Sequence, residues 1–227
     1  MSMIRPGAYE SVYTHILRLF AQKKITWTAT GDDVLNYYGA PKFVTGLQVC
    51  VAKDNLDRAR DAFQDDSTWC KQSAPAVDSY QDVFKEYPRF KLCNDDLFIT
   101  VVPATLYGLN PLNTKKFIQP HPSDSCPMLH LKYHVEGIAE HVSKNANDPN
   151  ITWWKMRLEF LIDGMDIDKD WCEKHLKDGP GRELVLSKST PAAKINRIGK
   201  RKYMDGMLTC YVDKDNRAEV IKTMGRN

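Results

Sequence analysis

The stretch ITWTATGDDVLNYYGAPKFVTGLQVCV, residues 25–51, predicts a strand, a turn, a helix and a second strand in that order. Residues 25–31 alternate β-branched and aromatic side chains before a glycine, which is typical of a strand that runs into a turn. Residues 32–39 start with two aspartates, either of which can cap a helix, and end at a glycine. Residues 43–51 read as an apolar strand. This order predicts the start of an α/β domain.

The neighbouring segments extend the same pattern. Residues 8–23 place apolar side chains at helical spacing, and residues 54–64 predict a helix with Asp54 at its cap. Residues 87–111 predict two further strands around an Asn-Asp-Asp turn. A proline-punctuated connection follows, and beyond it the helical period dominates. We therefore place a domain boundary near residue 115.

The predicted fold class is α/β (α+β), with a mixed sheet flanked by helices in residues 1–115. Residues 116–227 are expected to be mainly helical and to contain a basic segment at residues 182–202. A hydrophobic content of 42% is enough for a sizeable core. The net charge of +3 is mild, so nucleic-acid contact requires the basic residues to be clustered.

The cysteines and the hydropathy pattern indicate a cytoplasmic protein. The six cysteines are widely spread, so we expect mostly buried, reduced thiols rather than a disulfide framework or a zinc ribbon. The first residues lack the apolar core of a signal peptide. No apolar run approaches the roughly 20 residues of a membrane span, so no membrane partner is expected.

The order of strand, glycine turn, short helix, basic loop, strand and helix resembles the nucleotidyltransferase fold of the DNA polymerase β superfamily. The segment from Gly31 to Lys42, GDDVLNYYGAPK, is similar to a G-(D/E)-x-A-L-x-Y-Y-x-V-P-R segment in small fungal proteins with a nucleotidyltransferase-like domain. The resemblance covers residues 25–63, and more loosely residues 87–111. It implies a nucleotidyltransferase-like mixed sheet in the first domain.

The resemblance also implies a metal site that this chain lacks. Active members of the superfamily support nucleotide phosphates at the glycine turn and hold two divalent cations with two strand carboxylates spaced two apart. The corresponding strand positions here are Gly46 and Gln48. An amide does not replace an anionic Mg²⁺ ligand, and glycine has no side chain to offer. We therefore expect neither a metal nor a cofactor, and we expect the charge of Asp32 and Asp33 to disfavour a triphosphate.

The predicted catalytic residues are Asp32, Asp33 and Gln48. One aspartate is accounted for by helix capping, and the other is a candidate general base or a clamp for a cationic substrate group such as a guanidinium. Gln48 is expected to bind the aminoacyl group of a substrate. The alternative role of Tyr37 is packing in the core. The alternative for Lys42 is that it is exposed to solvent and has no function. The predicted substrate-binding residues are Gly31, Tyr37, Lys42 and Thr45.

Two further groups of residues could carry function. Cys126, His130, His134 and His141 share a helical face, which is compatible with zinc, but the pattern lacks the acidic residue of H-E-x-x-H. Partly buried or surface histidines, and no metal, are predicted instead. Residues 182–202 contain seven basic residues, which indicates either a solvated face or an RNA-contacting surface. The predicted RNA-binding residues are Lys194, Arg197, Lys200, Arg201 and Lys202.

Three functions fit these observations, and we favour the first. It is a metal-independent transferase, most concretely an arginine-containing, aminoacyl-tRNA-dependent cyclodipeptide synthase of fungal natural-product biosynthesis, with tRNA and an amino-acid or other small-molecule substrate as partners. An aminoacyl ester is already activated, so it needs positioning and proton transfer rather than a metal. The second is a conventional metal-dependent nucleotidyltransferase with relocated carboxylates. The third is an inactive pseudoenzyme that binds RNA or a nucleotide.

Overall fold

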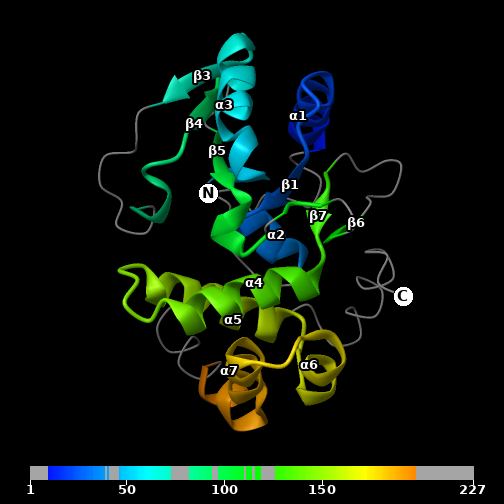
Figure 1. Ribbon diagram of the computed structural model, residues 1–227, viewed down its shortest axis with the longest axis vertical. Helices are drawn as coiled ribbons and strands as arrows, with labels where there is room; N and C mark the ends of the chain where they lie inside the picture. The colour runs from blue at the N-terminus through cyan, green and yellow to red at the C-terminus, as the bar shows by residue number, and fades with distance from the viewer. Residues whose placement is uncertain are drawn as a thin grey trace. The chain divides into compact units, whose positions relative to one another are not determined.

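The computed structural model has a mixed α/β fold, with a mixed sheet flanked by helices and a mostly helical second half, as the sequence predicts (Figure 1). None of the helices described has both the length and the apolar character needed to cross a membrane. The residues that the structure describes are 10–38, 40, 46–72, 82–93, 97–109, 111–113, 116–118 and 126–197.

Within those residues, seven strands form one sheet: β1 (Trp27–Thr30), β2 (Leu47–Val51), β3 (Trp69–Gln72), β4 (Arg89–Leu92), β5 (Phe98–Pro103), β6 (Phe117–Ile118) and β7 (Met128–Leu129). Their order across the sheet is β3-β4-β5-β2-β1-β7-β6. β2 pairs antiparallel with β1 and parallel with β5, and β5 pairs antiparallel with β4. The sequence did not predict β3, β6 or β7, because β3 is a largely polar edge strand and the other two have two residues each.

The helices of the first half are α1 (Glu10–Gln22), α2 (Asp32–Tyr37) and α3 (Leu56–Asp65), with 3-10 turns η1 (Lys53–Asn55), η2 (Asp82–Phe84) and η3 (Ala104–Tyr107). The predicted cap of α3 is wrong, since Asp54 lies inside η1 and Asn55 is the N-cap residue. α2 begins at Asp32, so both predicted capping aspartates lie in its first turn instead. Negative charge there is favoured by the helix dipole.

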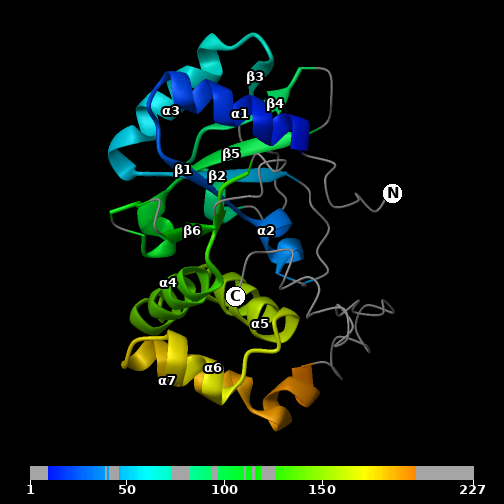
Figure 2. The ribbon, with the colours of Figure 1, turned by 90° about the vertical axis from the view of Figure 1, so that its right-hand side faces the viewer.

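One face of the sheet is apolar. Its residues alternate along the strands and are all buried: Ala29, Leu47, Val49, Phe90, Ile99 and Val101. α1 and α3 lie on the same side of the sheet (Figure 2). The Phe63 ring of α3 lies 5.0 Å from the Phe90 ring, between ring centroids, and 5.4 Å from the Phe20 ring of α1. Burial of these aromatic rings supplies much of the hydrophobic stabilisation of this half.

The opposite face carries a polar row. Residues that are paired across neighbouring strands point to the same face of a sheet. Thr30 of β1 pairs with Gln48 of β2, Gln48 pairs with Thr100 of β5, and Thr100 pairs with Arg89 of β4. These four residues form what we call the polar row. The polar row occupies one end of this face, which also carries the buried Cys50 and Val102.

The contacts within the chain divide it into two compact units. The first comprises Met1–Val34 and Phe43–His130, and the second comprises Leu35–Lys42 and Leu131–Asn227. The division at residue 130 lies beyond the boundary expected near residue 115, because β6 and β7 pair with each other and β7 pairs with β1. The two short strands thus belong to the sheet of the first unit.

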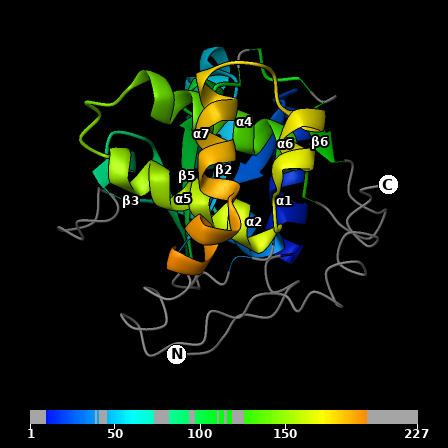
Figure 3. The ribbon, with the colours of Figure 1, turned by 90° about the horizontal axis from the view of Figure 1, so that it is seen from below.

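The second unit is helical in the residues described (Figure 3). Its helices are α4 (Leu131–Lys144), α5 (Ile151–Gly164), α6 (Lys169–His175) and α7 (Pro180–Ser189), followed by a helical segment at residues 191–197. Fully or almost fully buried Ile138, Trp154 and Val185 form part of its core. Asp168 caps α6 by accepting a hydrogen bond from the Trp171 N–H at 2.8 Å.

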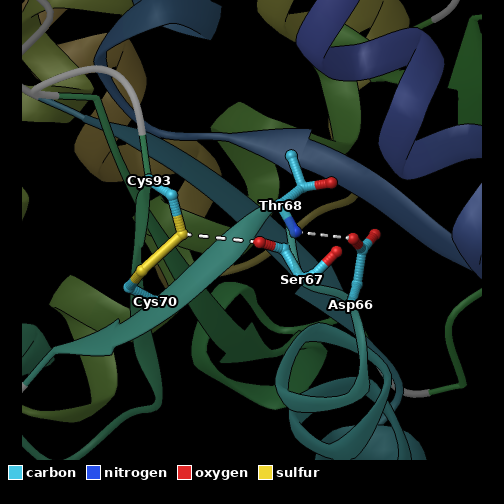
Figure 4. Close-up of a disulfide and its surroundings, with 5 residues drawn as sticks. All are labelled: Asp66, Ser67, Thr68, Cys70 and Cys93. Atoms are coloured by element: carbon cyan, nitrogen blue, oxygen red, sulfur yellow. Dashed lines mark hydrogen bonds between the residues drawn. A yellow bond between two sulfur atoms is a disulfide. The ribbon is translucent and has the colours of Figure 1, made fainter.

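One cysteine prediction is wrong: Cys70 and Cys93 are joined by a disulfide and are exposed (Figure 4). The antiparallel pairing of β3 with β4 brings their Cα atoms to 5.7 Å, within the range that a disulfide spans. This pairing joins residues 23 positions apart, which sequence spacing did not indicate. Cys50, Cys126 and Cys172 are buried free thiols, as predicted, and Cys210 lies outside the described residues.

Candidate active site at the polar face of the sheet

The site is built around the turn that joins β1 to α2. Gly31 has a positive φ of 100°, a conformation that residues with a side chain rarely adopt. A β-carbon at this position would lie 3.1 Å from both Cβ and Cγ of Gln48. The glycine therefore lets the turn pass directly against the Gln48 side chain, which brings the start of α2 close to the second strand.

Asp33 places a carboxyl group in this turn. The Tyr13 hydroxyl of α1 donates a hydrogen bond to Asp33 Oδ2, and Asp33 Oδ1 is buried without a hydrogen bond to any described residue. Burial raises the pKa of Asp33 from 3.8 to about 7, with a further rise from the charge of Asp32, while the Tyr13 hydrogen bond opposes the rise. Both protonation states are thus populated near neutral pH, as a group that accepts and returns a proton requires.

The Gln48 side chain lies against Gly31 and is held by a hydrogen bond. The Tyr107 hydroxyl of η3 donates a hydrogen bond of 2.8 Å to Gln48 Oε1, so the amide nitrogen is directed away from Tyr107. The Thr30 hydroxyl oxygen is buried without a hydrogen bond to any described residue, and Thr30 is the cross-strand partner of Gln48. An amide donor and a hydroxyl therefore line one end of the polar face, whereas the Asp33 carboxyl group lies in the adjoining turn and contacts Tyr13 of α1.

Gly46 and Gln48, the two strand positions considered for metal-binding carboxylates, provide no carboxylate. Gly46 directly precedes β2, and a β-carbon on it would lie 3.1 Å from the Phe98 carbonyl oxygen. A carboxylate at residue 46 would require the backbone of β5 to shift. Gln48 is hydrogen-bonded and uncharged. Within the residues described, no three His, Cys, Asp or Glu side chains are arranged to hold a metal ion.

The structure brings together two of the predicted site residues, Gly31 and Gln48, and Asp33 follows Gly31 in the same turn but contacts Tyr13. Asp32 is half-exposed in the first turn of α2. Tyr37 is half-buried and packs edge-on against the buried Tyr38, with ring centroids 5.2 Å apart. Lys42 and Thr45 lie outside the described residues.

Three residues of the site were not predicted: Tyr13, Thr30 and Tyr107. Tyr13 lies 20 residues before Asp33, and Tyr107 lies 59 residues after Gln48. Local sequence patterns do not predict contacts between residues that are so far apart in the chain. Thr30 had a detectable signal, because it is the last strand residue before the glycine turn.

The basic segment has acidic partners that its own sequence does not contain. Arg197 donates to both carboxylate oxygens of the buried Asp163, at 2.6 and 3.1 Å, and Lys194 pairs with Asp166 at 2.8 Å. These acids lie in or just after α5, so the charges of residues 182–202 alone did not indicate them. RNA contact by the segment stays a prediction, and Lys200, Arg201 and Lys202 lie outside the described residues.

Two of the histidines considered for a zinc site, His134 and His141, belong to the second unit. His134 is fully buried, and burial lowers its pKa to about 3, with a smaller contribution from the positive charge of Arg157. His141 pairs with Asp148, with Nε2 and Oδ2 2.7 Å apart. His134 is therefore neutral at physiological pH, which agrees with a buried histidine of the core.

No protein-family model and no curated protein matches this sequence. Among solved structures, that of ANT(2″)-Ia in complex with adenylyl-2″-tobramycin is similar, with a TM-score of 0.45 and 8% identity over 79% of this chain and 98% of the other. An antigenic nucleotidyltransferase-like protein from Paracoccidioides brasiliensis has a TM-score of 0.43 and 9% identity, over 87% and 90%. JHP933 from Helicobacter pylori has a TM-score of 0.43 and 12% identity, over 99% and 92%.

Proposed function

We propose that this protein is a metal-independent transferase that uses an aminoacyl-tRNA as its activated substrate. The observation that carries this proposal is the buried Asp33 carboxyl group in the turn after β1, whose pKa of about 7 suits proton transfer. The specific form we propose is an arginine-containing cyclodipeptide synthase. Its cytoplasmic location and its place in fungal natural-product biosynthesis are part of the same proposal.

The chemistry requires only positioning and a proton acceptor. The α-amino nitrogen of one aminoacyl group attacks the ester carbonyl carbon of another, forming a C–N bond and breaking the C–O bond to the ribose. The proton lost by the nitrogen passes to the Asp33 carboxylate and then to the departing ribose oxygen, so the reaction needs no external acid. A second such step within the dipeptidyl ester closes the ring. General-base assistance of this kind contributes roughly 10²- to 10⁴-fold.

The remaining polar groups have distinct roles in this proposal. The Gln48 amide, oriented by Tyr107, and the Thr30 hydroxyl donate hydrogen bonds to the carbonyl oxygen that becomes negatively charged. Asp32 is half-exposed in the same turn, and it pairs with the substrate guanidinium. Asp33, which is half protonated near neutral pH, is reserved for proton transfer.

The test incubates the purified full-length protein with total tRNA, aminoacyl-tRNA synthetases, amino acids and ATP, and analyses the products by mass spectrometry. We expect arginine-containing cyclic dipeptides, formed at the same rate when aminoacyl-tRNA charged beforehand is supplied in buffer that contains EDTA and no Mg²⁺. Asp33→Asn should lower the rate at least about 100-fold. Asp57→Asn, which changes an exposed aspartate of α3, is the matched control and should leave the rate unchanged.

Two outcomes contradict the proposal. Incorporation of labelled nucleotide into RNA or protein, without cyclic dipeptides, would indicate a nucleotidyltransferase that uses Asp32 and Asp33 as relocated carboxylates. Absence of any product, together with binding of tRNA by the folded protein, would indicate a binding protein without catalytic activity.

A further inference from the structure

The disulfide between Cys70 and Cys93 is accessible to small reagents, because both cysteines are exposed. The other cysteines that the structure describes, Cys50, Cys126 and Cys172, are buried free thiols. Thiol–disulfide exchange requires direct attack of a thiolate on a sulfur atom, so exposure decides which cysteines react. Among the described residues, this exchange chemistry is therefore concentrated at the pair of Cys70 and Cys93.

The disulfide joins the edge strand of the sheet to its neighbour. β3 is the last strand in the order of the sheet, and within the residues described it pairs only with β4, through four residue pairs. A strand with one partner opens more easily than a strand with a partner on each side. A cross-link between the two strands limits how far they separate. Opening of β3 is therefore the motion that this bond restrains.

The surroundings of the disulfide also suit the two cysteines as free thiols. The Cys93 sulfur lies 3.5 Å from the Ser67 carbonyl oxygen, so a thiol at this position can donate a hydrogen bond to it (Figure 4). The Cys93 backbone N–H donates to the Thr68 carbonyl oxygen at 3.0 Å, which holds residue 93 beside the start of β3 independently of the sulfur atoms. The buried Trp69 side chain packs against Phe63 of α3, with ring centroids 5.2 Å apart. These contacts keep the two cysteines close together after reduction, so the bond can form again.

We propose that Cys70 and Cys93 form a reversible redox pair that exchanges electrons with a low-molecular-weight thiol such as glutathione, and that reduction loosens β3. A small thiolate attacks one sulfur atom, breaks the S–S bond and forms a mixed disulfide with the protein. A second small thiolate attacks the mixed disulfide and releases the protein thiolate. Two small thiols thus become one small disulfide, and the protein gains two electrons and two protons. In the order of the sheet, β4 and β5 separate β3 from β2 of the candidate active site.

The first test places the folded, full-length protein in buffers with different ratios of reduced to oxidised glutathione, followed by alkylation and peptide mapping by mass spectrometry. We expect Cys70 and Cys93 to be alkylated together in reducing buffer and to become protected again when oxidised glutathione is restored. The buried Cys50 and Cys172 should stay unmodified in both buffers. The far-UV circular dichroism spectrum should not change, because the packing of Trp69 and the backbone contact of Cys93 do not depend on the disulfide.

The second test measures amide hydrogen exchange in the oxidised and the reduced protein. Exchange across residues 69–72 should be at least about tenfold faster after reduction, because the cross-link no longer limits the opening of β3. Exchange across residues 47–51 of β2, which has a strand partner on each side, should not change. A variant that combines Cys70→Ser and Cys93→Ser should exchange fast in both buffers. Cys172→Ala, which removes a buried thiol of α6, is the control and should keep the full difference.

Three results would overturn the redox pair. The disulfide could resist glutathione as long as the protein is folded, reduction could unfold the whole chain, or exchange across residues 69–72 could be equally fast in both states. The first two would show a purely structural cross-link, and the third would show a bond without influence on β3. None of these measurements depends on the formation of cyclic dipeptides, so the redox pair and the proposed function are tested separately.

Discussion

Asp33 in the first unit and Asp163 in the second are both buried, but the structure compensates their charges differently. Asp163 receives two hydrogen bonds from the Arg197 guanidinium. Asp33 receives one from the neutral Tyr13 hydroxyl, and its pKa rises to about 7. A buried carboxylate that is paired with a cation links two segments of a fold. A buried carboxylate whose charge is not balanced by a cation can bind and release a proton near neutral pH. Asp163 therefore has a structural role, and Asp33 is able to exchange a proton near neutral pH.

The largest effect is expected at the compensated aspartate. Arg197→Met leaves the Asp163 charge buried, with 2% of its side chain exposed, and should lower the free energy of unfolding by about 3–5 kcal/mol. Urea unfolding measures this change. Lys144→Met, which breaks an exposed pair with Glu140, is the control and should cost less than about 0.5 kcal/mol. Equal effects of the two substitutions would show that the Asp163 pair is not structural.

The second effect is expected at Asp33, where the substitution Asp33→Asn should raise the free energy of unfolding at pH 8 instead of lowering it. Because its folded pKa is raised, the folded protein binds the proton more tightly than the unfolded chain. The stability that Asp33 contributes is therefore fully present below pH 3.8 and is lost as the pH rises through about 7. At 1.36 kcal/mol per pKa unit, the loss is at most about 4 kcal/mol. Asp33→Asn should remove this dependence and stabilise the protein at pH 8.

Thermal or urea unfolding of wild type and Asp33→Asn between pH 5 and pH 8 tests this point. The difference between the two proteins should grow with pH across that range. If Asp33→Asn destabilises the protein equally at both pH values, Asp33 is a structural acid like Asp163, and the contrast between them disappears.

A smaller effect is expected at the turn that positions Asp33. Gly31→Ala combines a positive φ with a β-carbon 3.1 Å from the Gln48 side chain, and should cost about 1–3 kcal/mol. Gly108→Ala also falls at a positive φ, but in an exposed residue after η3, and serves as the matched backbone control. A larger loss of activity in Gly31→Ala than in Gly108→Ala, at similar stability, would show that contact with Gln48 matters beyond backbone strain.

The smallest and most specific change concerns Tyr13. Tyr13→Phe removes the hydrogen bond that holds the pKa of Asp33 down, so that pKa should rise above about 7. The lost hydrogen bond is expected to cost on the order of 1 kcal/mol. Carboxyl-carbon NMR titration of Asp33 reads the shift directly. An unchanged pKa would mean that Tyr13 does not act on the carboxyl group.

The first half of the fold was largely predictable because its signals are local. α1, β1, α2 and β2 follow from apolar periodicity and from the glycine at residue 31. α3 was predicted with the wrong cap, since η1 precedes it and takes up Asp54. The short β6 and β7 were missed because two residues carry no periodicity, so their membership in the sheet depends on pairing with β1.

The candidate site was predictable only in the part that lies on one continuous segment. Gly31, Asp33 and Gln48 fall within 18 consecutive positions, and the strand and turn patterns there were enough to relate Gly31 to the strand of Gln48. Tyr13 and Tyr107 join them from other elements, and Asp163 is joined to Arg197 from a separate helix. Tertiary packing brings such partners together, so they cannot be predicted from the residues of a single segment.

The disulfide between Cys70 and Cys93 has a consequence for the integrity of the chain. A protease site engineered into residues 73–81 would cut the backbone between the two linked cysteines. The two fragments would then remain one covalent molecule, migrating as a single band on a non-reducing gel and as two bands after addition of dithiothreitol. The polypeptide is thus continuous by two routes at this edge of the sheet, through its backbone and through its sulfur atoms.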